Sequence, residues 1–113
     1  MSCLFCSIIE GEIPAKKVYE DDSVLAFHDI TPAAPVHVLV VPKKHIEKLT
    51  DLTDEDSGVM GHILTLMPRL LSELGLEGRG VRVVNNCLEE AGQSVFHIHF
   101  HILGGRAFSW PPG

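Results

Sequence analysis

Polar and apolar residues alternate one by one near the end of the chain, in the stretch FHIHFHIL at positions 96–103. Single apolar residues separate His97, His99 and His101. Successive side chains of a β-strand point to opposite faces, so this period predicts a strand that carries the three imidazoles on one face. Ile98, Phe100 and Ile102 then point to the opposite, buried face, while Val95 lies on the histidine side.

Shorter patterns predict the other elements in front of this strand. A short helix is expected over residues 3–10, before Gly11 and Pro14. AKKVYEDDSVLAFHDI reads as a hairpin that turns at residues 20–22, and VHVLVVPK and GVRVVNN read as two further strands. The order of strands, helix and strands predicts an α+β domain with a mainly antiparallel sheet.

One longer helix is expected between the strands. Thr53 is a suitable N-cap with Asp56 three residues on, and apolar residues then recur at helical spacing towards Gly75. Pro68 removes one backbone donor from this helix, so we expect either a kink there or a start later than Thr53.

Length and charge narrow the possible functions. The 113 residues are enough for one domain, 1–113, with a core of its own. A net charge of −6 argues against general nucleic-acid binding, which needs clustered Lys and Arg. No apolar run reaches the roughly 18–20 residues of a membrane span, and the first residues lack a signal-peptide pattern, so a cytoplasmic protein without membrane partners is expected.

The spacing of the three histidines limits what they can bind together. The backbones of His97 and His101 would lie about 13 Å apart on a strand, which disfavours one metal ion shared by all three imidazoles. A row of imidazoles along an elongated anion, such as a phosphate with its leaving group, suits the spacing better. The alternative is a polar sheet face that is simply rich in histidine.

Several stretches together resemble the histidine triad (HIT) family, and within it the Hint branch of nucleoside phosphoramidate hydrolases. They are EIPAKKVYEDDSVLAFHDITPAAPVHVLVVPKKHI, GQSVFHIHFHILGGR and the terminal WPPG. The resemblance implies a five-stranded, mainly antiparallel sheet with one long and one short helix, joined across a homodimer. It also implies hydrolysis of AMP or GMP linked to amines, with aminoacyl-adenylates as further candidates, and no organic cofactor. VVNNCLEEAGQSV is a residue longer than is typical of the branch.

The resemblance also implies roles for the polar residues. His99 is expected to attack the α-phosphorus and form a nucleotidyl-histidine, because a neutral imidazole is a good nucleophile at physiological pH. His101 and His37 would stabilise phosphate oxygens and move protons. Ser94 and Gln93 would present donors to the phosphate or the leaving group, and Asn85 would add another donor.

The same resemblance implies a purine nucleoside site. Asp29 would accept hydrogen bonds from both ribose hydroxyls, and His28 would lie against the base edge. Taken alone, apolar residues at such positions more often belong to an ordinary core than to a pocket. The residues expected around the substrate are Phe5, Ile8, Ile13, Phe27, Ile30, Leu39 and Val95, with Trp110 reaching the leaving group of the other subunit.

Cys3 and Cys6 form a C-x-x-C pair, which by itself is compatible with redox chemistry or with two ordinary thiols. His45 and His97 match positions that bind zinc in some bacterial members of the wider family. The resemblance therefore implies a closed Cys₂His₂ structural zinc site. Cys87 is expected to be a loop thiol without an assigned role.

Two other functions remain open at this point. A dinucleoside polyphosphate hydrolase would use the same triad on a longer substrate, although the SWPPG tail resembles the Hint branch. A nucleotide-binding dimeric interaction module without important turnover is the second alternative, and the intact His37, His99 and His101 favour an enzyme over it.

Overall fold

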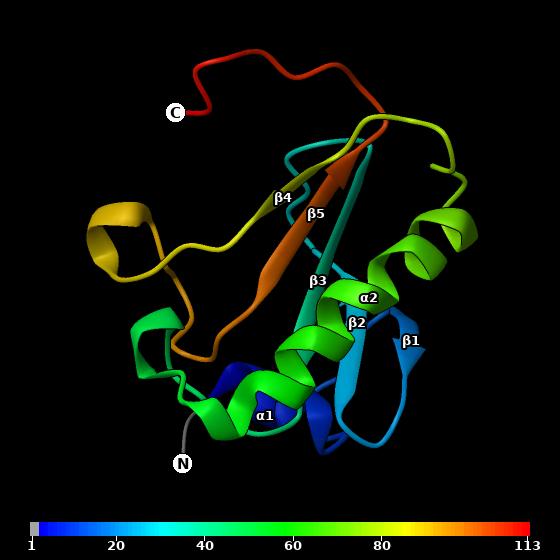
Figure 1. Ribbon diagram of the computed structural model, residues 1–113. Coiled ribbons are helices and arrows are strands. Elements are labelled where there is room, and N and C mark those ends of the chain that lie inside the picture. The colour runs from blue at the N-terminus through cyan, green and yellow to red at the C-terminus, as the bar shows by residue number, and fades with distance from the viewer. Residues whose placement is uncertain (1–2) are drawn as a thin grey trace.

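The computed structural model describes residues 3–113 and contains one five-stranded sheet flanked by two helices (Figure 1). The elements are α1 (Leu4–Ile9), β1 (Lys17–Glu20), β2 (Val24–His28), β3 (Val36–Pro42), α2 (Ser57–Glu73), β4 (Arg82–Val84) and β5 (Phe100–Gly104). The strand order is β1-β2-β3-β5-β4, and every neighbouring pair is antiparallel. The predicted α+β fold with a mainly antiparallel sheet is confirmed.

Apolar side chains on both faces of the central strands build two separate cores, because β2 and β3 are buried on each side. The larger core lies between α2 and the sheet face that carries Val24, Val38 and Ile102. On the opposite face, Phe5 and Ile8 of α1 pack against the side chains of β2 and β3. His97 and His99 lie on this second face, where Phe5 of α1 packs edge-on against both rings.

The long helix starts later than Thr53, as one of the two expectations had it. Thr53 caps a 3₁₀ turn over Asp54–Asp56, in which the Thr53 N–H donates to Oδ2 of Asp56 at 3.0 Å. α2 then runs from Ser57 to Glu73 with Pro68 inside it. Across residues 3–113, no helix combines the length and the apolar character that a membrane span requires.

The expected strand over the histidine stretch is wrong in its first half. β5 begins only at Phe100, so His97 and His99 precede it, and β4 is shorter than the stretch GVRVVNN. The ladder between β3 and β5 ends at the pair of Val40 and Phe100. Beyond that pair, the Ile98 N–H donates to the Ile46 carbonyl in the loop after β3 at 2.6 Å. The predicted division of faces still holds, since Ile98 is buried and Ile102 joins the α2 core.

Candidate active site

His99 is buried just before β5, and its hydrogen bond fixes which ring nitrogen carries the proton. Nδ1 of His99 lies 2.8 Å from the carbonyl oxygen of His97, which can only accept. The proton is therefore on Nδ1, and Nε2 keeps its lone pair. Burial lowers the pKa of His99 below its usual value, which favours this neutral form. The result is a neutral imidazole with a nucleophilic nitrogen.

His37 and His101 form a second chain of hydrogen bonds with an equally defined direction. The Ala33 N–H donates to Nδ1 of His37 at 2.9 Å, so the His37 proton is on Nε2. Nε2 of His37 lies 2.8 Å from Nδ1 of His101 and donates to it. The proton of His101 is then on its own Nε2, a buried atom that has no partner within residues 3–113. A buried donor without an acceptor is costly, so this N–H is available to an acceptor that enters the site.

The neutral state of His101 also has a physical cause. Burial first, and then the neighbouring rings of His99 and His37, lower the pKa of His101 to about 4. The His99 and His101 rings are 5.1 Å apart between centroids. At neutral pH the pair therefore offers a lone pair on one ring and an N–H donor on the next.

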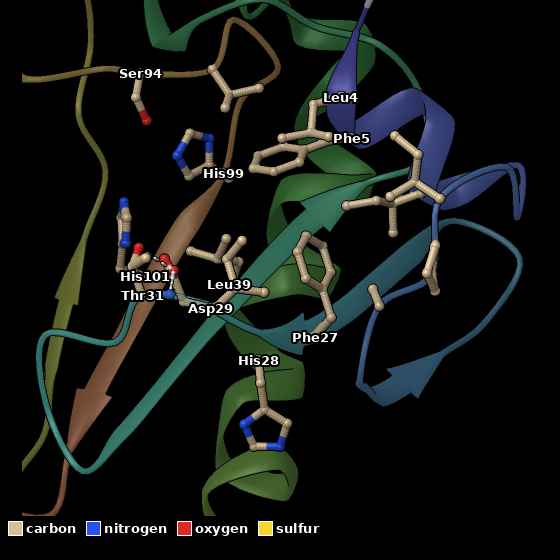
Figure 2. A pocket seen from close by; sticks show the side chains of 16 residues that line it. Leu4, Phe5, Phe27, His28, Asp29, Thr31, Leu39, Ser94, His99 and His101 are labelled. Atoms are coloured by element: carbon tan, nitrogen blue, oxygen red, sulfur yellow. Dashed lines mark hydrogen bonds between the residues drawn. The ribbon is translucent and has the colours of Figure 1, made fainter.

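These two histidines lie at one side of a cavity of about 240 Å³ (Figure 2). Phe5 and Phe27 form an edge-to-face pair at 5.5 Å in its wall, and Asp29 lies near His101. The expected residues in the lining are Phe5, Ile8, Ile13, Phe27, His28, Asp29, Ile30, Leu39, Ser94, Val95, His99 and His101. Leu4, Pro14, Ala15 and Thr31, which were not among the expected residues, line it too. Ile30 is 94% exposed, which places it at the rim.

Asp29 is oriented by its own turn. Oδ1 of Asp29 accepts hydrogen bonds from the backbone N–H of Thr31 at 2.9 Å and from its hydroxyl at 3.2 Å. Oδ2 lies 3.4 Å from Nε2 of His37. The carboxylate is thus fixed as an acceptor between the rim and the His37 and His101 pair.

Three expected substrate contacts lie outside the cavity lining. Gln93 is buried and bonds only to backbone: it donates to the carbonyls of Glu47 and Val95 and accepts from the Leu88 N–H. Nδ2 of Asn85 donates to the His99 carbonyl at 2.9 Å. Both therefore hold the backbone around Ser94 and His99. Trp110 is 81% exposed, on a C-terminal segment that extends away from the sheet (Figure 1).

Cys3, Cys6, His45 and His97 come together as a second cluster, with one ligand atom of each within 4.8 Å of all the others. Sulfur to Nδ1 distances are 3.4 Å for Cys3 and His97 and 3.3 Å for Cys6 and His45, and the two Nδ1 atoms are 3.1 Å apart. A tetrahedral zinc ion with ordinary bond lengths separates sulfur and nitrogen by about 3.5 Å and two nitrogens by about 3.3 Å. The donor set and its spacing fit zinc.

The protonation of the cluster also suits a cation. Nε2 of His97 lies 2.8 Å from the Pro42 carbonyl and must donate to it, which leaves a lone pair on Nδ1 towards the cluster. Burial, together with the Cys3 thiol, raises the pKa of Cys6 to about 11. A thiolate at this position therefore needs a positive charge beside it.

This combination of an antiparallel sheet, paired histidines and an apolar cavity defines a HIT domain. The model of that family matches residues 10–108, and the chain belongs to it. A HIT-like protein of Synechocystis sp. is 53% identical over 110 residues, which cover 97% of this chain and 96% of that protein.

Solved structures agree with this assignment. A HIT family hydrolase from Legionella pneumophila has a TM-score of 0.96 and 50% identity, covering 99% of this chain and 100% of that one. A histidine triad nucleotide-binding protein from Candida albicans has a TM-score of 0.83 and 36% identity, covering 97% of this chain and 83% of that one.

The low pKa of His101 predicts a loss of stability in mild acid. The unfolded chain binds a proton at this residue near pH 6.5 but the folded chain only near pH 4, so the unfolded state holds more protons between these values. The free energy of unfolding should fall as the pH drops from about 6.5 to 4, with His101 contributing up to about 1.4 kcal/mol per pH unit. Urea unfolding of the wild type and of His101→Gln at pH 7, 6, 5 and 4.5 measures this slope. The slope should be shallower in the variant, and parallel curves would contradict the assignment.

Proposed function

We propose that the protein hydrolyses nucleoside 5′-phosphoramidates, AMP or GMP joined to an amine, through a covalent nucleotidyl-His99 intermediate. Aminoacyl-adenylates are a related substrate class for the same site. One observation carries the proposal: the lone pair on Nε2 of His99 stands beside the partnerless N–H of His101 at one side of an apolar cavity. A nucleophile next to a donor for an anionic oxygen is the arrangement that substitution at phosphorus requires.

In the first step, Nε2 of His99 attacks the α-phosphorus and forms a P–N bond, while the bond from phosphorus to the leaving amine breaks. Nε2–H of His101 donates to a phosphate oxygen, and His37 holds the His101 ring in the tautomer that can do so. The Ser94 hydroxyl lies in the lining, where it can donate a proton to the departing nitrogen. Water then attacks phosphorus, the P–N bond to His99 breaks with its electron pair returning to Nε2, and one proton of the water restores the Ser94 hydroxyl as the nucleoside monophosphate leaves.

The rest of the cavity suits a purine nucleoside. Phe5 and Phe27 provide an aromatic wall for a flat base, and Ile8 and Leu39 extend that wall. Asp29 is an oriented acceptor for ribose hydroxyls, since its carboxylate is held by Thr31. The likeness to a hydrolase from Legionella pneumophila supports the proposed hydrolysis, and the likeness to a nucleotide-binding protein from Candida albicans supports the proposed nucleotide site.

The proposal includes a homodimer in which Trp110 of one subunit borders the leaving-group site of the other. β4 is an edge strand of the sheet, and its Val83 is 44% exposed, which leaves an apolar edge for a second sheet to continue. Trp110 is exposed to 81% on a segment stiffened by Pro111 and Pro112. A large exposed indole is typical of a contact surface.

Zinc is the proposed cofactor, held by Cys3, Cys6, His45 and His97. Four protein ligands leave no open position for water, so zinc here supplies structural cross-linking of α1 to the two histidine segments. The reaction steps above use only the imidazoles and the Ser94 hydroxyl.

Removing the nucleophile tests the proposed reaction. His99→Ala should lower kcat for an AMP amide by about three orders of magnitude or more, while the Kd for AMP changes little because the base wall and Asp29 remain. Stopped-flow or fluorescence turnover and calorimetric AMP binding measure the two quantities. His62→Ala, on the far helix α2, is the matched control and should retain turnover. Substantial turnover by His99→Ala would refute the covalent mechanism.

Native mass spectrometry tests the metal. The wild type should carry about one zinc ion per chain, and Cys3→Ser with Cys6→Ser should lose it and melt at a lower temperature. Cys87→Ser is the control for a cysteine outside the cluster and should keep the ion. If the wild-type protein takes up no zinc, even when it is refolded in the presence of zinc, the proposed zinc site is wrong.

A further inference from the structure

α1 belongs to the metal cluster and to the nucleotide cavity at the same time. Cys3 and Cys6 bracket Phe5 in the sequence, so the cluster ligands and an aromatic wall of the cavity share a single helical turn. α1 has only six residues, and a helix of that length is not stable without tertiary contacts. Its position depends on Phe5 and Ile8 in the small core and on the ligands of the cluster.

His97 connects the cluster to the nucleophile by a second route. Nδ1 of His97 faces the cluster, while its carbonyl accepts the Nδ1–H of His99 at 2.8 Å. The Phe5 ring packs edge-on against both rings, with centroid distances of 6.0 Å to His97 and 5.0 Å to His99. A change in the position of His97 therefore reaches the ring that lines the cavity.

The cluster is also reachable from solvent without opening the main core. Cys3 and His45 line a second hollow of about 430 Å³, together with Glu47 and Phe96. That hollow shares Leu4, Ser94 and Val95 with the nucleotide cavity. The core between α2 and the sheet contains none of the four cluster residues. Exchange of an ion would therefore disturb α1 and the small core that includes Cys3, but not the core under α2.

From these contacts we infer that the cluster of Cys3, Cys6, His45 and His97 is an exchangeable effector site whose occupancy sets the affinity of the nucleotide cavity. This inference rests on the proposed nucleotide function and on zinc as the ion. With the ion bound, α1 and His97 are fixed, and Phe5 and His99 are in place for the ligand. Without it, the ligand must order α1 itself, and that cost weakens its binding.

The affinities for zinc and for the nucleotide are thermodynamically linked if the two sites are coupled. If zinc tightens nucleotide binding by some factor, the nucleotide must tighten zinc binding by the same factor. A purely structural ion that merely adds to global stability would leave the nucleotide affinity of the folded protein unchanged.

Calorimetry with AMP on the full-length protein tests this. Protein loaded with one equivalent of zinc should bind AMP about tenfold more tightly than chelator-treated protein, within the usual range of coupling between sites. A zinc-indicator titration should show the same factor between AMP-saturated and AMP-free protein. His45→Ala, which changes a ligand that lies outside the nucleotide cavity, should bind AMP like the metal-free wild type. His45→Cys restores a ligand and should recover the tight binding, and His62→Ala should behave as the wild type.

Amide hydrogen exchange tests the effect of zinc on α1 and His97 without any measurement of nucleotide affinity. Chelation should speed amide exchange in α1 and around residues 97–99, but not in α2. Equal AMP affinity with and without bound zinc would overturn the inference, and so would loss of the whole fold on chelation. If zinc does not bind, the effector site alone fails. If zinc-loaded protein does not bind AMP, the proposed nucleotide function fails.

Discussion

The hydrogen bond from Nδ1 of His99 to the carbonyl of His97 determines what the rest of the site can do. A ring nitrogen that donates to a carbonyl leaves the opposite nitrogen with its lone pair. Had Nε2 of His99 carried the proton instead, the cavity would present two donors and no nucleophile. The chain from Ala33 through His37 sets the complementary tautomer on His101. Two neighbouring imidazoles thereby acquire opposite functions without any charged group between them.

Backbone groups select these tautomers. The backbone groups near His99 are free to bond to side chains because the chain is not part of the regular sheet just before β5. The His97 carbonyl can accept from a side chain two residues on because β5 has not yet begun at that point. Ile98 and Gln93 hold this irregular stretch against the loop after β3. Asn85 fixes the carbonyl of His99. The departure from the expected strand is therefore part of the chemistry of the site.

The alternation of residues 96–103 was sufficient to predict which side chains share a face, because the period of two persists even where the ladder stops. The antiparallel sheet and the long helix also followed from local patterns. The functions of Gln93 and Asn85 could not be predicted in this way, since their partners are backbone groups that only the tertiary fold brings near. Thr31 carries a local signal that would have been sufficient: it lies two residues after Asp29, the spacing of an Asx turn.

Long-range ¹H–¹⁵N correlation spectra of ¹⁵N-histidine-labelled protein at neutral pH show which ring nitrogen of each histidine carries the proton. We expect His99 to be protonated at Nδ1 and His37 and His101 to be protonated at Nε2. His99→Ala and His101→Gln assign the signals. A spectrum in which His99 carries its proton on Nε2, or in which His101 is doubly protonated at pH 7, would contradict the account.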